Sequence, residues 1–196
     1  MRKSTMTMAV ATLAISLLIV GATLAWFTSE GEVTNLFATG DVAITLHDLL
    51  ETEEATGDFP SEGISNVTPG DSYGKQVYVS SQGSIGTYVR VRLTPQWEFE
   101  NQLANLVNLD TDMVLLNLDT ENWVFIGGWY YYKGILQQGD QTTLLLDGLT
   151  FSPEMGNEYA NGIYTLEVEA EGIQATNDAI NSAWGVNPLT WEAINP

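Results

Sequence analysis

The sequence predicts an all-β protein, an antiparallel β-sandwich of jelly-roll type with short helical or loop insertions. Three observations favour this class: about eight short segments alternate apolar and polar residues, turn signals separate them at fairly even spacing, and few segments have helical periodicity. Of the 196 residues 44% are hydrophobic, enough for one domain with a sizeable core. We expect a signal peptide over residues 1–25, an N-terminal strand over 26–40 and the sandwich domain over 41–196.

The N-terminus has the pattern of a targeting segment. Two basic residues at positions 2 and 3 precede an uncharged run from Met8 to Phe27. The run is also long enough for a short transmembrane anchor, which remains the alternative. Small residues in Thr23-Leu24-Ala25 suit a signal peptidase, so we expect cleavage between Ala25 and Trp26.

The mature chain is strongly acidic. Cleavage removes two of the six basic residues and none of the 25 acidic ones, which leaves four against 25 and a formal charge of −21. This charge disfavours nucleic acid and anionic lipid as partners, so we expect membrane contact only through the signal peptide before cleavage. The chain has no cysteine, so core packing and hydrogen bonds must hold an exported form without disulfides.

The first strands follow directly on the apolar run. Alternation of apolar and polar residues predicts a strand over 41–47, and a second candidate strand precedes it over 32–38. Six acidic residues with Pro60 and Gly63 predict that 48–65 is a solvated loop, and the sequence TPGD at 68–71 predicts a turn.

The next two segments, 73–81 and 85–95, flank Gln82-Gly83-Ser84 and predict a hairpin. In the second segment the odd-numbered positions from 89 to 93 are apolar, whereas Tyr88, Arg90 and Arg92 share the other face. We therefore expect the odd-numbered face to be buried.

The second half of the chain continues the pattern. Residues 95–121 suit a short helix or a loop, and the aromatic segment 122–136 predicts a strand with a bulge or turn at Gly127-Gly128. Strands are predicted again over 141–151 and 162–174, and one helical turn over 177–185.

Residue types argue against catalysis. A zinc hydrolase or a triad hydrolase needs histidines or cysteines close together, but this chain has one histidine, no cysteine and no HExxH motif. We interpret His47 as an outward-facing strand residue, and we expect no enzymatic activity and no cofactor other than, at most, Ca²⁺. Two pairs of acids, Asp110 with Asp112 and Asp119 with Glu121, have spacing found in metal loops and are the candidate calcium ligands. A glycosidase carboxylate pair stays open on residue type alone.

Four stretches carry a resemblance to a known family. The stretch AWFTSEGEVTNLFATGDVAI is similar to the signal-and-first-strand motif of the TasA and camelysin family. Three later stretches resemble its alternate-signal-mediated exported, BsaA-like branch: VTPGDSYGKQVYVSSQGSIGTYVRVRL, GGWYYYKGILQQGDQTTLLLDGLTF and YTLEVEAEGIQATNDAINSAWG.

The resemblance implies a Gram-positive secreted or cell-surface protein that a dedicated signal peptidase processes. The best understood relatives form biofilm matrix fibres, in which each subunit gives its N-terminal strand to the next. We therefore expect a homopolymeric matrix fibre. A camelysin-like secreted metalloprotease and a monomeric surface binding module are the alternatives, and the missing zinc motif speaks against the first.

Donor-strand exchange also explains why the targeting segment runs into a strand without a linker. The signal peptide would block this strand until cleavage, after which it completes the sheet of another subunit. We expect its apolar side chains to fill pockets there: Trp26, Phe27, Val33, Leu36 and Phe37. Pairing of the same strand within its own subunit is the competing hypothesis.

Overall fold

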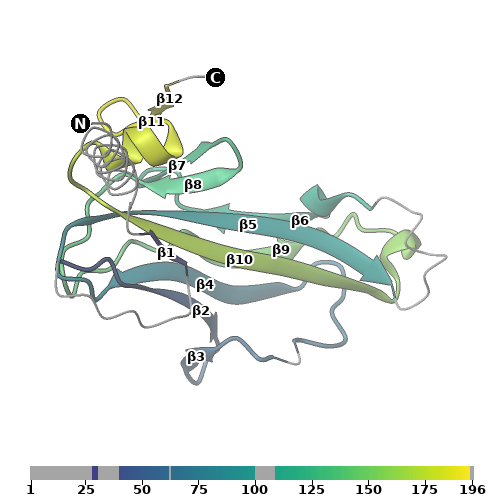
Figure 1. Ribbon diagram of the computed structural model, residues 1–196. Coiled ribbons are helices and arrows are strands. Elements are labelled where there is room, and N and C mark those ends of the chain that lie inside the picture. Colours follow the sequence, from purple (N-terminus) through teal and green to yellow (C-terminus); the bar gives the residue numbers. More distant parts are fainter. Residues whose placement is uncertain (1–27, 31–39, 62, 100–108, 195–196) are drawn as a thin grey trace, which may run out of the picture.

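The fold is an all-β sandwich of two five-stranded antiparallel sheets, as the alternation predicts (Figure 1). The computed structural model describes residues 28–30, 40–61, 63–99 and 109–194. The first sheet has the order β1-β10-β5-β8-β7, with β1 at Thr28–Glu30, β10 at Gly162–Gln174, β5 at Thr87–Phe99, β8 at Trp129–Tyr132 and β7 at Trp123–Ile126. The second has the order β3-β2-β4-β9-β6, with β3 at Thr56–Asp58, β2 at Ile44–Glu51, β4 at Ser72–Ser81, β9 at Leu146–Phe151 and β6 at Val114–Leu118.

The strand pairing has the nested order of a jelly roll. Strand β1 pairs with β10, β4 with β9 and β5 with β8, so the first half of the chain runs antiparallel to the second half. Rolling this ribbon up brings β5 beside β10 and β6 beside β9. Strand β2 adds to the outer side of β4, and β3 adds to β2.

The core lies between the sheets. Val77 and Val79 of β4 and Val89 and Val91 of β5 are all fully buried in one cluster, which also contains Trp123. This burial confirms the apolar face predicted for β5. The predicted hairpin is wrong, because β4 and β5 belong to different sheets and pack face to face instead of pairing edge to edge.

The acidic segment after residue 47 is more ordered than predicted. Strand β2 continues to Glu51, and β3 pairs with its end. The reason is Lys75, which is 3% exposed and whose Nζ lies 2.5 Å from Oδ1 of Asp48 and 4.0 Å from the ring centre of Phe59. The positive charge of Lys75 compensates the negative charge of Asp48, whose carboxylate would otherwise favour a solvated position over one in a strand.

Other local predictions hold. Gly127 and Gly128 have φ of 57° and 89° and form the turn of the β7–β8 hairpin, where two residues with positive φ match the strand twist. Strand β10 covers the predicted range of 162–174. By contrast, the short helix or loop predicted for 95–121 is wrong in part: β5 continues to Phe99 and β6 spans Val114–Leu118, and the helical piece is the segment η2 (Thr111–Met113). Residues 100–108 lie outside the described part.

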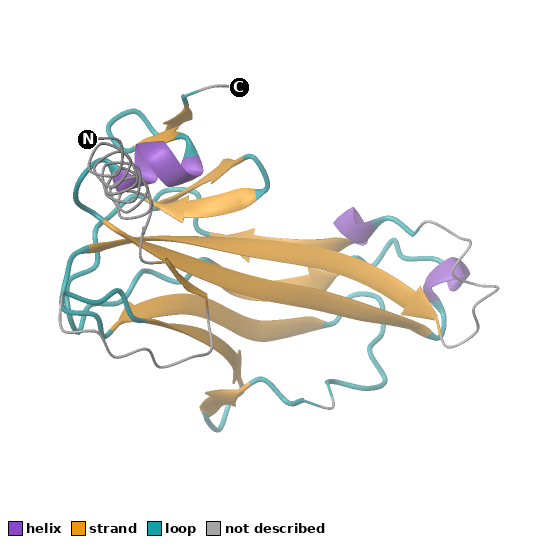
Figure 2. Cartoon of the chain, viewed as in Figure 1, coloured by secondary structure: helices purple, strands orange, loops and turns teal. Residues whose placement is uncertain are grey.

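Among the described residues, helical structure is confined to short segments (Figure 2). The others are η3 (Asn157–Tyr159) and η4 (Ile180–Trp184), which confirms the helical turn predicted near the C-terminus. After η4 the chain forms the small pair β11 (Val186–Asn187) and β12 (Glu192–Ala193). Within the described ranges, no helix has the length and apolarity needed to cross a membrane.

Candidate functional site

The edge of β10 is the place where the N-terminal strand meets the sandwich. On one side β5 pairs with all thirteen residues of β10, from Gly162 to Gln174. On the other side β1 pairs with only three, residues 171–173. Within the described part of the chain, no strand pairs with this side of β10 from Gly162 to Ala170.

The core face of this edge is apolar. Leu166 and Val168 of β10 are half-buried and pack against the main core, as do Ile44 and Leu46 of β2 across the sandwich. The sheets come close at Gly172, where a Cβ atom would lie 3.0 Å from Cγ2 of Ile44. The edge therefore offers unpaired backbone groups and apolar surface together, which is what an added strand requires.

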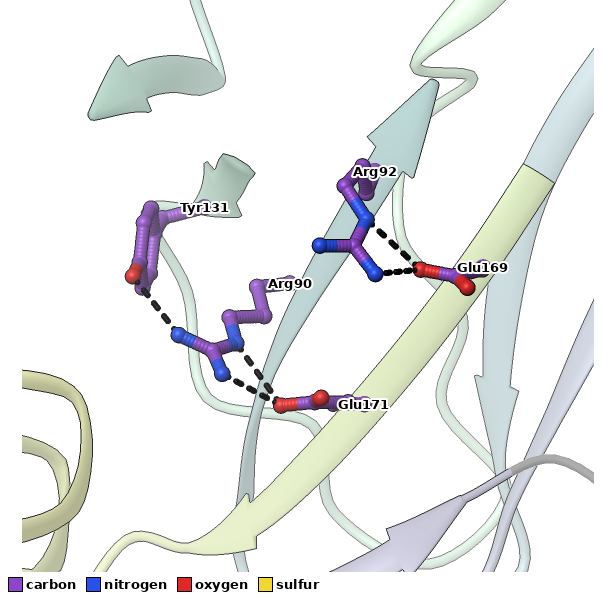
Figure 3. A network of polar contacts seen from close by, with 5 residues as sticks. All are labelled: Arg90, Arg92, Tyr131, Glu169 and Glu171. Carbon is purple, nitrogen blue, oxygen red and sulfur yellow. Dashed lines mark hydrogen bonds and ion pairs between the residues drawn. The ribbon is translucent and has the colours of Figure 1, made fainter. Parts of the chain in front are cut away.

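Behind this edge, a polar cluster on the outer face of the first sheet surrounds Arg90 (Figure 3). Its Nε and Nη2 donate to Oε2 of Glu171 at 2.8 and 2.5 Å, and its Nη1 donates to the Tyr131 hydroxyl at 3.0 Å. The guanidinium carbon lies 4.2 and 4.5 Å from the ring centres of Trp129 and Trp184. The Arg90 side chain is 15% exposed, so its ion pair is stronger than a typical surface pair.

Arg92, two residues further along β5, repeats the arrangement in a weaker form. Its Nε donates to Oε2 of Glu169 at 2.6 Å, and its guanidinium lies 4.6 Å from the centre of the Trp129 ring. Both charged side chains are more than 40% exposed, so solvent screens this pair.

The Arg90 cluster joins the C-terminal segment to the sheet. Ile180 of η4 and Val186 of β11 are buried against Tyr131 of β8 on the outer face of the sheet. The Trp184 ring meets the Tyr131 ring edge to face at 5.8 Å. Because Glu171 is also the Cα partner of Glu30, one residue of β10 links β1 with the C-terminal layer.

The predicted donor-strand residues Trp26, Phe27, Val33, Leu36 and Phe37 and the cleavage residue Ala25 lie outside the described residues. Their described neighbours, Thr28–Glu30, form β1 and pair with β10 of the same chain.

The predicted calcium ligands lie on turns: Oδ1 of Asp110 accepts from the N–H of Asp112, and Oδ1 of Asp119 accepts from the N–H of Glu121.

Strand β6 separates the two acid pairs, so the structure does not bring all four carboxylates together. Among the described residues no three histidine or acidic side chains cluster as metal ligands would. Calcium binding therefore stays a prediction without a ligand set.

His47 faces outward as predicted. Its ring stacks on the Tyr78 ring with the ring centres 4.3 Å apart, and its Nε2 lies 2.8 Å from Oγ of Ser80.

Asp119 should make stability depend on pH. Hydrogen bonds lower the pKa of Asp119 from 3.8 to about 2. The largest contribution comes from the backbone N–H of Asn122, and the side chains of Asn122 and Thr143 and the N–H of Glu121 add to it. The folded-state pKa lies below the unfolded one, so the stabilisation is complete above about pH 4 and is lost as pH falls towards about 2. Urea unfolding should show that Asp119→Asn is less stable than wild type near neutral pH and loses less on acidification. Equal losses in both proteins would contradict this role.

Sequence reasoning missed the Arg90 cluster. Alternation sets Arg90 and Arg92 on one face of their strand, and the same two-residue period over 162–174 sets Glu167, Glu169 and Glu171 on one face of another. The opposite charges of the two faces are the signal that they adjoin, but the strands are about eighty residues apart, and no local pattern specifies that they pair.

A comparison with known protein families identifies the family of this chain. A family model described as camelysin metallo-endopeptidase matches residues 1–113, more than half of the chain. The chain belongs to the camelysin family. This confirms the resemblance to the TasA and camelysin family, while the alternate-signal branch stays a prediction. The matched range ends after η2, so the camelysin match includes β1 and β5 but not β10. No curated protein matches the chain.

Proposed function

We propose that this protein is a secreted cell-surface or matrix protein whose mature chains assemble into fibres by exchange of the N-terminal strand. One observation carries the proposal: β1 occupies three residues at one end of a thirteen-residue edge that is otherwise unpaired among the described residues. Membership of a family of secreted or surface proteins supports the location.

The physical basis is that an edge strand with an apolar face is a template for another strand. Main-chain hydrogen bonds supply affinity, and each fully buried apolar side chain contributes on the order of 2 kcal/mol. Electron microscopy of purified mature protein tests the proposal. Filaments are expected, whereas a monomer at high concentration would favour the surface binding module.

Export requires cleavage before the strand is free. We expect N-terminal sequencing of secreted protein to begin at Trp26, because the small residues of Thr23-Leu24-Ala25 precede it. Recovery of only the full-length chain in a detergent extract would instead support a membrane anchor.

The description of the family, camelysin metallo-endopeptidase, favours one second candidate function, that of a metallo-endopeptidase. We expect purified mature protein not to cleave casein, since among the described residues His47 has no companion zinc ligands. The assay compares wild type with His47→Ala, with and without a chelator. Robust cleavage that both the chelator and the substitution abolish would establish the protease instead.

A further inference from the structure

The turn between η3 and β10 contains the one Asn-Gly pair of the sequence, Asn161 followed by Gly162. Asn161 is exposed and has a φ of 62°, and its side-chain amide makes no hydrogen bond with the described residues. Glycine has no Cβ atom to shield its own main-chain nitrogen. The nitrogen of Gly162 is therefore sterically open to the side chain that precedes it.

The strand register decides where the Gly162 N–H points. The Ala175 N–H donates to the Gly86 carbonyl at 2.7 Å, one position beyond the last pair of the β5–β10 ladder. In an antiparallel ladder, hydrogen-bonded and non-hydrogen-bonded pairs alternate. Gly162 lies an odd number of positions from Ala175, so its pair with Phe99 is non-hydrogen-bonded. The Gly162 N–H consequently points away from β5.

This N–H faces the edge of β10 on which, among the described residues, only β1 pairs, and β1 covers residues 171–173 at the far end. Within the same described part, no carbonyl of the preceding turn accepts from it either. A main-chain N–H in a ladder must lose a hydrogen bond before its nitrogen can react. The Gly162 nitrogen has no such bond to lose.

We propose that Asn161 is a site of spontaneous deamidation and isomerisation in the folded protein. The Gly162 nitrogen loses its proton to water and bonds to Cγ of Asn161. The Cγ–Nδ2 bond breaks, and Nδ2 takes up a proton and leaves as ammonia, so that a succinimide ring remains. Water then opens the ring. Its attack at Cγ gives aspartate, and its attack at the main-chain carbonyl gives isoaspartate, in which the main chain runs through the former side chain.

The isoaspartate product should disturb the end of the sandwich. A Cβ atom on Gly162 would lie 3.0 Å from the Tyr159 carbonyl oxygen and 3.1 Å from the Trp97 ring, so the main chain is closely enclosed there. The Trp97 ring also packs on the rings of Tyr159 and Tyr164, with centres 5.1 and 5.2 Å away. Isoaspartate adds one carbon to the main chain before Gly162, and this space cannot accept it unless the ring moves. Aspartate leaves the main-chain length unchanged.

Two other asparagines serve as internal comparisons. Asn66 and Asn177 are also exposed, with φ of 59° and 56°. They precede Val67 and Asp178, whose Cβ substituents shield the nitrogen that would have to attack. Local conformation and exposure are thus matched at the three sites, and the following residue differs.

Mass spectrometry of the mature protein, incubated for days at neutral pH, tests the site. Chymotrypsin cleaves after Tyr159 and Tyr164 and releases residues 160–164, and a sample taken before incubation corrects for deamidation during digestion. We expect this peptide to change from the amide to the acid, while the peptides of Asn66 and Asn177 keep their amides. Protein isoaspartyl methyltransferase should label the aged protein. The label should be lost in Asn161→Gly, which tolerates the positive φ.

Retention of the Asn161 amide in folded protein, with its loss in urea-unfolded protein, would overturn the proposal, because the fold would then protect the site. Equal deamidation at Asn177 would overturn the role of Gly162. The aged protein, separated by its extra negative charge, should melt at a lower temperature than fresh Asn161→Asp protein, which carries the same charge on an unaltered main chain. Identical melting of a methyltransferase-positive sample and Asn161→Asp would overturn the effect on the Trp97 packing.

Discussion

Mature protein that lacks residues 26–38 is expected to remain monomeric under conditions in which the full mature chain forms filaments. The deletion removes β1 together with the other residues of the proposed donor strand, so within the described part of the chain no strand pairs with the β10 edge opposite β5. Several apolar side chains at about 2 kcal/mol each are lost at once, so assembly should fail completely and not merely weaken. Sedimentation and electron microscopy measure the loss, and a peptide of residues 26–38 should bind the truncated protein.

Single substitutions separate the role of the strand from the effect of truncation. Phe37→Asp places a charge at an apolar position and should abolish assembly. Phe37→Leu, its matched control, keeps an apolar side chain and should retain filaments. Wild-type assembly by the truncated protein, or equal behaviour of the two Phe37 variants, would show that this strand does not join the subunits.

Arg90→Ala should cause the largest loss of stability among single substitutions on the outer face of the first sheet. It removes the ion pair with Glu171, the hydrogen bond to Tyr131 and the contacts with two tryptophan rings. Loss of one partner of a largely desolvated pair, with the stacking contacts, predicts a decrease of about 3 kcal/mol in the free energy of unfolding. Urea unfolding followed by tryptophan fluorescence measures it.

Arg92→Ala is the matched control on the same face of β5. Its partner Glu169 is exposed, so the expected decrease is about 0.5 kcal/mol. Arg90→Lys should lower the free energy of unfolding by an amount between these two values, because an ammonium keeps the charge but cannot donate from two nitrogens to Glu171 as the guanidinium does. Equal losses for Arg90→Ala and Arg92→Ala would mean that the greater burial of Arg90 and its contacts with Tyr131 and Trp184 add nothing to the ion pair.

Much of the local structure is a property of the sequence alone. The alternation from Gly162 to Gln174 determined both the extent of β10 and its buried face, because side chains in a strand repeat every two residues. Gly127-Gly128 determined the β7–β8 turn, since two consecutive residues with positive φ favour glycine. The uncharged N-terminal run and the absence of clustered histidines and cysteines set the functional expectations in the same way.

Only the tertiary structure decided which faces meet. Alternation cannot distinguish a hairpin from two strands packed face to face, which is why β4 and β5 were wrongly expected to pair. The sequence predicts a solvated Asp48, but the buried Lys75 supplies its counter-charge within the strand, whereas Glu51 at the strand end stays exposed. The pairing of Arg90 with Glu171 and the partial cover of β10 by β1 both depend on register between distant strands. That register follows from how the whole core packs, a long-range balance of burial that no short segment of sequence contains.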